Sequence, residues 1–160
     1  MSKIEIEIAD EQETLEVSED LIRAAVNAVL AKDRILCAEM SIALVDDETI
    51  HGINRQFLGH DYPTDVISFP LSDSSAKLEG EIVLSTDTAS REALRVEGSW
   101  DAQKEVLLYV IHGCLHLIGF DDHEDEDLAE MRRAEIECLR AIGVEPPDGL
   151  HDRDGEEGAA

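Results

Sequence analysis

The strongest constraint on the fold is a helical pattern from Ser99 to Gly119 that is apolar around most of its girth. A helix of this kind is buried among other elements rather than lying on the surface. We expect Ser99 to open the helix, with Asp101 in its first turn, and Gly119 to stand just past its end. The apolar positions are Val106, Leu107, Val110, Ile111, Cys114, Leu115 and Ile118.

Two histidines interrupt this pattern. His112 and His116 are four residues apart, which places them one turn apart on one face of the helix. A third histidine, His123, follows Gly119 in an acidic loop. The pair alone is also compatible with core histidines, but burying two imidazoles is unfavourable unless their nitrogens find partners. Three protein ligands leave the fourth position of a zinc ion open, as in catalytic sites. We predict one zinc ion per chain, bound by His112, His116 and His123.

Composition limits the class of protein. The 160 residues, 43% of them hydrophobic, suit one globular domain. No apolar run of about 18 residues and no N-terminal apolar signal segment is present, so we expect a cytoplasmic protein without a membrane segment. Cys37, Cys114 and Cys138 lack CxxC spacing and are interpreted as reduced thiols. The net charge of −25 argues against broad phosphate binding, and no DNA partner is expected.

Periodicity and capping signals predict the other elements. Strands are expected at 3–8, 40–45, 66–69 and 80–85, and helices are expected after Ser18, after Asp46 or Asp47, after Thr86 or Asp87, and at 125–142. Strands come early and helices late. This order indicates a single-domain α+β fold, with a mixed sheet of about four strands packed with helices and the metal-binding helix at the centre. We expect residues 1–145 to form this domain and residues 146–160 to be a disordered acidic tail.

A second informative segment, residues 53–70, has more polar side chains than a simple connection between two elements requires. The polar residues are Asn54, Asp61, Thr64, Asp65 and Ser68. One interpretation is turn chemistry alone, in which Asp61 and Thr64 hydrogen-bond the loop and Pro63 stiffens it.

Together the two segments resemble the YbeY family of bacterial endoribonucleases and ribosomal RNA maturation factors. The motif blocks match in order and spacing over most of the chain except the tail. They comprise Asn54, Phe57, Asp61, Pro63, Thr64, Asp65, Val66, Ile67, Ser68 and Phe69, then Gly80, Glu81, Ile82 and Val83, then His112, Gly113, Leu115, His116, Leu117, Gly119, Phe120 and Asp121.

The resemblance implies a zinc-dependent endoribonuclease that cleaves single-stranded RNA. It implies a role in ribosomal RNA maturation, at the 3′ end of the small-subunit RNA, and in ribosome quality control. The partners it implies are ribosomal RNA and the ribosome or its proteins.

Two positions depart from the family pattern. Asp122 occupies the usual place of the third histidine ligand, and His123 comes one residue later. Carboxylates also bind zinc, so Asp122 is an alternative ligand, although we favour the imidazole of His123. Leu58 stands where family members commonly carry an arginine that is important for RNA cleavage. Arg55, one helical turn earlier, is the candidate catalytic residue to replace that arginine.

Gly113 separates the chain from zinc peptidases. Their H-E-x-x-H motif carries a glutamate at this position as the general base, and glycine cannot accept a proton from water. Two other classes of function stay open: a metal-dependent hydrolase of another substrate, and a non-catalytic ribosome-associated protein with structural zinc.

Overall fold

The computed structural model describes residues 3–62, 64–72 and 76–153, and in this part of the chain four strands form one sheet. The strands are β1 (Lys3–Asp10), β2 (Cys37–Val45), β3 (Val66–Pro70) and β4 (Leu78–Ser85), in the order β1-β2-β4-β3. β1, β2 and β4 run parallel, whereas β3 pairs antiparallel with β4. The predicted mixed sheet of about four strands is therefore confirmed.

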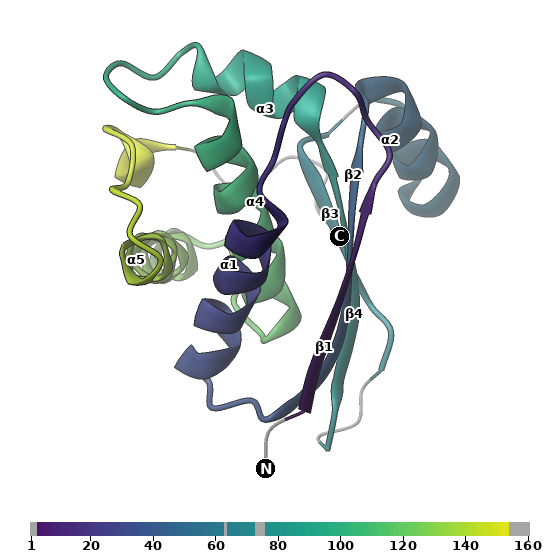
Figure 1. Cartoon of the computed structure of the whole chain (residues 1–160), viewed down its shortest axis with the longest axis vertical. Helices are drawn as coiled ribbons and strands as arrows, with labels where there is room; N and C mark the ends of the chain where they lie inside the picture. Colours follow the sequence, from purple (N-terminus) through teal and green to yellow (C-terminus); the bar gives the residue numbers. More distant parts are fainter. Residues whose placement is uncertain (1–2, 63, 73–75, 154–160) are drawn as a thin grey trace.

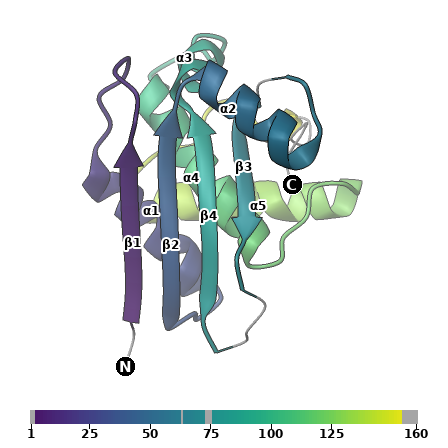
Figure 2. The same ribbon diagram turned by 90° about the vertical axis from the view of Figure 1, so that its right-hand side faces the viewer.

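Helices cover mainly one face of this sheet. Figure 1 shows α1 and α4 next to the sheet and α5 outside them, and Figure 2 shows that α2 lies over one end of the opposite face. The helices are α1 (Glu19–Lys32), α2 (Asp47–Ile53), α3 (Thr86–Ala93), α4 (Ala102–Leu117) and α5 (Asp125–Ala141). A π-helical turn (Asn54–Leu58) continues α2, and a short 3-10 helix (Leu150–Asp152) follows α5.

The core lies between the sheet and α1, α3, α4 and α5. Every α4 residue from Glu105 to Leu115 is buried, and the helix contacts α1, α3, α5, β3 and β4. This confirms the central position that the apolar pattern predicted. Each fully buried aliphatic side chain, such as Leu107 or Ile111, stabilises the fold by about 1.5–3 kcal/mol. Among the described helices, none has the length and apolar character needed to cross a bilayer.

Capping residues fix the helix starts, and two of them differ from the sequence prediction. The side chain of Ser85, rather than Thr86 or Asp87, accepts a hydrogen bond from the Thr88 amide at 3.2 Å and caps α3. A side-chain oxygen caps a helix when its own residue stays extended and a free amide lies two or three residues ahead. Thr86 and Asp87 are already helical.

At α4 the cap is Asp101, not Ser99. Its carboxylate accepts a hydrogen bond from the Lys104 amide at 2.9 Å, so the helix starts at Ala102, two residues later than a Ser99 cap would imply. Ser18 and Asp46 cap α1 and α2, each from a position the sequence offered.

The segment after α5 differs in part from the disordered tail expected at 146–160. Residues 146–153 pack against the domain: Leu150 is buried, and the guanidinium of Arg153 donates hydrogen bonds to both carboxylate oxygens of Glu105 at 2.9 and 3.1 Å. The physical reason is that Glu105 is fully buried and needs a cationic partner. Residues 154–160 lie outside the described residues.

A carboxylate network joins α2 to α3. Asp47 at the start of α2 accepts hydrogen bonds from Ser85 (2.6 Å), Thr88 (2.8 Å) and Arg91 (2.6 Å). Partial burial alone would raise the pKa of Asp47, but these hydrogen bonds outweigh it and hold the pKa below the ordinary value of 3.8. The charged form of Asp47 therefore stabilises the contact between the two helices.

We predict that Asp47→Asn lowers the free energy of unfolding at pH 7 by about 1–3 kcal/mol, because the acceptor loses its charge. The folded-state pKa is depressed, so this stabilisation is fully present above pH 3.8 and is lost as the pH falls through the lower folded-state value. Urea unfolding at pH 7, 5 and 3 measures the difference between wild type and variant. Glu48→Gln, which removes an exposed charge from the same helix, is the control. A difference that grows at pH 3 would contradict the prediction.

Candidate metal centre and adjoining cavity

The two histidines of α4 point to one place. Their Nε2 atoms lie 3.1 Å apart, and the rings meet edge to face with centroids 4.7 Å apart. The side chain of His112 is 6% exposed and that of His116 is 11% exposed. The helical spacing thus brings two ligand nitrogens together in a largely buried position, as expected.

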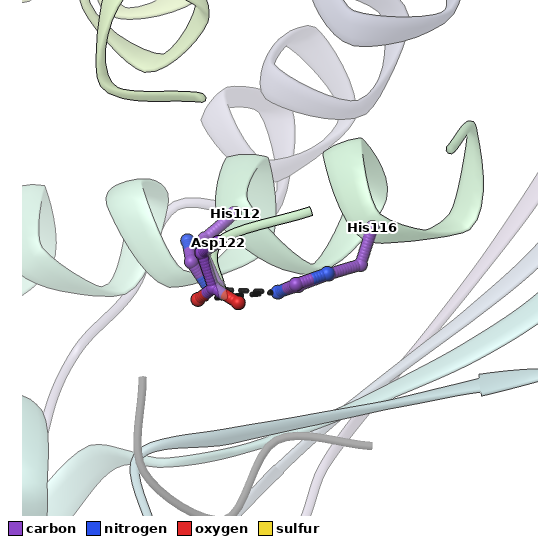
Figure 3. Close-up of side chains that lie close together, drawn as sticks. All are labelled: His112, His116 and Asp122. Carbon is purple, nitrogen blue, oxygen red and sulfur yellow. Dashed lines mark hydrogen bonds and ion pairs between the residues drawn. The ribbon is translucent and has the colours of Figure 1, made fainter. Parts of the chain in front are cut away.

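The loop after α4 adds a carboxylate to this pair. Gly119 has a positive φ of 110°, which glycine adopts readily, so the chain can reverse after the helix. The Oδ2 atom of Asp122 then lies 3.6 Å from the Nε2 atoms of both His112 and His116, and its side chain is 1% exposed. The three side chains converge below α4 (Figure 3). They form a group of three potential metal ligands.

His123 lies beside this group rather than within it. Its side chain is 72% exposed, with ring nitrogens 3.7 Å from an oxygen of Asp121 and 3.9 Å from Oδ1 of Asp122. Asp121 also accepts hydrogen bonds from the amides of Asp122 (2.7 Å) and His123 (3.3 Å), which holds the turn. The structure therefore brings Asp122, and not His123, to the two helical histidines. Asp121, Asp122 and His123 form a second, more exposed group of potential ligands.

A buried acid–base chain holds His112 from the opposite side. Its Nδ1–H donates to Glu135 of α5 at 2.7 Å, and Arg132 donates to the other oxygen of Glu135 at 2.6 Å. Burial raises the pKa of Glu135, but the hydrogen bond from His112 and the charge of Arg132 outweigh it, so the net shift is downward. An ionised Glu135 favours the tautomer of His112 that has its proton on Nδ1, so the lone pair of Nε2 is directed at His116 and Asp122.

Sequence reasoning missed Glu135 and Arg132, although a signal was present. Glu135 falls on the apolar stripe of α5, four residues after Met131 and three before Cys138. A charged residue at a core position requires a buried partner, and that expectation was available from the sequence.

Gly113 allows α4 to approach the sheet closely between the two histidines. A Cβ atom at this position would lie 3.1–3.2 Å from side-chain carbons of Ile82 on β4. The hydroxyl of Ser68 on β3 donates to the Gly113 carbonyl at 3.1 Å. Any larger residue at position 113 would therefore require the Ile82 side chain to shift by a few tenths of an ångström, so glycine suits the close packing here.

The polar segment 53–70 lies next to the α4 site. The side chain of Asn54 is buried and donates to the Tyr62 carbonyl at 2.8 Å, and the Val66 amide donates to Asp65 at 2.9 Å. Of the two side chains that the turn interpretation expects to bond the loop, Thr64 donates to Asp65 at 3.3 Å, whereas Asp61 lies 2.9 Å from the ring of His51 on α2. Turn chemistry therefore accounts for part of this segment. Pro63 lies outside the described residues.

The π-helical turn carries Leu58, which stands where family members commonly have an arginine. It also carries Arg55, the candidate to replace that arginine. The side chain of Arg55 is 66% exposed and lies 3.7 Å from a carboxylate oxygen of Asp61. Leu58 is half-buried and packs on a small second core under α2. Leu58 therefore has a packing role, and the part that Arg55 plays in catalysis stays a prediction.

A cavity of about 650 Å³ borders His112. Its other walls come from the loop before β3, from α3 and the residue Arg95 beyond it, from α5, and from the C-terminal segment. One face of α4 contributes Glu105, Leu108, Tyr109 and His112. The cavity thus leads along α4 to one of the two helical histidines.

Comparison with known proteins agrees with this geometry. A family model described as Endoribonuclease YbeY matches residues 5–143. The chain belongs to the YbeY family. The YbeY match includes both the polar segment 53–70 and the histidine segment of α4, so the resemblance found in the sequence is confirmed.

Individual relatives support the YbeY assignment. A protein of Rhodopirellula baltica named Endoribonuclease YbeY is 45% identical over 130 residues, which cover 80% of this chain and 66% of that protein. The protein of the same name from Chloroherpeton thalassium is 41% identical over 127 residues, covering 79% of this chain and 88% of the other. The solution structure of TM1509 from Thermotoga maritima aligns with a TM-score of 0.60 at 31% identity, covering 86% and 88% of the two chains.

Proposed function

We propose that this chain is a zinc-dependent endoribonuclease that cleaves single-stranded ribosomal RNA during maturation of the small-subunit 3′ end. Membership of the YbeY endoribonuclease family supports cleavage of RNA phosphodiester bonds. The observation that carries the metal dependence is the group of ligand atoms formed by His112, His116 and Asp122. Association with the ribosome and a part in its quality control belong to the same proposal.

The donor set fits zinc in both chemistry and spacing. Two imidazole nitrogens and one carboxylate oxygen are ligands of catalytic zinc sites. Ligand atoms at 2.0–2.2 Å from a tetrahedral ion are about 3.3–3.6 Å from one another. The three distances here are 3.1, 3.6 and 3.6 Å. The side chains are thus already close to the arrangement that zinc requires.

Each residue around the site has a different role in this proposal. Zinc, when bound, supplies a Lewis acid beside the phosphodiester and makes water acidic enough to lose a proton near neutral pH. Glu135 holds His112 with Nε2 directed at the site, and Arg132 keeps that glutamate ionised. Asp122 brings a carboxylate charge that partly offsets the charge of the cation. Gly113 cannot act as a base, so a proton acceptor must come from elsewhere than the second position of the motif.

The third ligand is open to a direct test. We predict that Asp122→Asn weakens zinc binding at least about tenfold, because a nearly isosteric amide is a much poorer ligand. His123→Ala should change it little, since that side chain is mostly exposed. Competition with a chromophoric chelator measures both affinities, and urea unfolding checks that both variants fold. A larger loss for His123→Ala would assign the third position to His123.

Glu135 would act on the metal centre only through His112, because its two oxygens already accept hydrogen bonds from His112 and Arg132. Glu135→Gln should lower zinc affinity about 10–100-fold, because the amide can present its NH₂ to Nδ1 and so no longer fixes the tautomer of His112. The same chelator titration measures the effect. Glu137→Gln on the same helix, whose carboxylate pairs with Lys32 at the surface, is the matched control. Equal affinities for the two variants would remove Glu135 from the metal centre.

RNA cleavage is the decisive experiment. We expect the purified protein to cleave a labelled single-stranded RNA and to cleave the same RNA poorly after it is annealed to its complement. Addition of a chelator should stop the cleavage. An A-form duplex presents mainly shape and backbone, whereas a single strand can enter a cleft. His116→Ala, purified in parallel, controls for contaminating nucleases. Equal cleavage by wild type and His116→Ala would leave the alternative of a non-catalytic protein with structural zinc.

A further inference from the structure

We propose that the cavity beside His112 binds one nucleotide of a single-stranded RNA, with its base stacked on Tyr62 and its phosphate held by Arg95. This inference rests on the proposed RNA-cleaving function and names the subsite next to the metal centre that selects single strands. Three features of the described residues carry it: the position of the exposed aromatic rings, the position of the arginines, and a buried hydroxyl group.

One of the exposed aromatic rings of the chain, that of Tyr62, lines the cavity. The chain has only three Phe, two Tyr and one Trp. Among the described residues, the exposed large aromatic side chains are Phe57 (63%) and Tyr62 (40%), and Tyr62 lines the cavity. Tyr62 stacks on His60 with ring centroids 5.5 Å apart and planes 7° from parallel. A ring held in this way is a ready platform for a nucleobase, because every base has a π-face to stack.

Arginines gather at the same cavity in an otherwise acidic chain. The whole chain has 13 Lys and Arg against 38 Asp and Glu, but four arginines line this cavity. Two of them serve buried carboxylates: Arg132 pairs with Glu135, and Arg153 pairs with Glu105. These pairs neutralise the two buried acids of the lining, and the acids that are left in it are Asp65, Glu92 and Asp152.

Arg95 is the arginine best placed to meet a phosphate. Its side chain is 76% exposed, and its ion pair with Glu92 is 3.5 Å long and partly solvated. Arg91 is also exposed, but it is held by Asp47 at 2.6 Å and by Thr88. A guanidinium has five N–H donors in a planar fork, which suits phosphate oxygens. Arg95 can therefore meet a phosphate with the loss of only this long surface ion pair.

A buried hydroxyl also lines this cavity, and it has no hydrogen bond of ordinary geometry among the described residues. Tyr109 is 4% exposed and lines the cavity one helical turn before His112, and its hydroxyl forms no hydrogen bond of ordinary length and angle. Burial, with the charges of Glu105 and Asp65, raises the pKa of Tyr109 far above its usual range, so the group stays a neutral donor. A nucleotide in the cavity would offer it a ribose or base acceptor.

This arrangement explains a preference for single strands. A base in a duplex is stacked and paired, so it cannot turn onto a side chain at the edge of a cavity. Only an unpaired nucleotide can place its base on Tyr62 while its phosphate meets Arg95. The adjacent phosphodiester then lies beside His112.

The test measures binding of a fluorescent eight-nucleotide single-stranded RNA, in chelator so that no cleavage occurs, by anisotropy at several salt concentrations. We expect Tyr62→Ala to weaken binding about tenfold, and Tyr62→Phe to bind like wild type because the ring is kept. Leu36→Ala, which removes another exposed apolar side chain, is the matched control. Arg95→Ala should lower the dependence of log K on log salt by about one, whereas Arg140→Ala, a variant of an exposed arginine outside the cavity, should leave it unchanged.

Oligonucleotides with one abasic residue, placed at each position in turn, identify the stacked base. At one position the missing base should weaken binding by wild type but not by Tyr62→Ala, because both changes remove the same stacking contact. Wild-type binding by Tyr62→Ala, or the absence of any such coupled position, would overturn the proposal. If either of these results is found and RNA cleavage still depends on metal, the subsite proposal is wrong and the proposed function stands. Coupling at one position, with cleavage no greater than that of His116→Ala, would support the subsite and sink the proposed function.

Discussion

The burial of α4 on all sides determines where the rest of the structure lies. A helix that is apolar around most of its girth must be enclosed, and here the sheet, α1, α3 and α5 enclose it. Gly113 sets the distance on the sheet side, because a larger residue would meet Ile82. The buried polar side chains of this helix, Glu105 and His112, line the cavity along one of its faces. The candidate metal centre and the cavity therefore share His112.

Polar groups buried in such a helix require partners from other elements, and these partners hold the outer parts of the fold. His112 is matched by Glu135 and Arg132 of α5. Glu105, on the same face of α4 and two turns before His112, is matched by Trp100 and by Arg153 of the C-terminal segment. The same interactions that offset the burial of charge therefore dock α5 and the last described residues. Loss of a charge at either place would leave its partner buried and unpaired. These pairs therefore both stabilise the fold and hold α5 and the C-terminal segment in position.

The sequence predicted those features that depend on local patterns. The order of the predicted strands and helices was sufficient for the mixed sheet, and the apolar girth of α4 was sufficient for its central position. The spacing of His112 and His116 was sufficient for their proximity. The third ligand position depends on how the loop after Gly119 turns, and spacing alone does not decide whether residue 122 or 123 faces inward. Glu135 reaches His112 from a helix 23 residues away in sequence. The cavity combines residues from four separate segments of the chain besides α4, and no local pattern encodes such a combination.

The charge of the chain constrains how it can use RNA as a substrate. With a net charge of −25, the surface as a whole repels a polyanion, and long-range attraction cannot supply the binding energy. Most arginines at the cavity are already engaged by carboxylates, so electrostatic contacts to phosphate are few. Under the proposed function, binding then rests on short-range interactions that do not depend on net charge, namely stacking on an aromatic ring and hydrogen bonds from neutral donors such as Tyr109. Stacking on a side chain requires an unpaired base, which links the acidity of this protein to the kind of RNA that we propose it accepts.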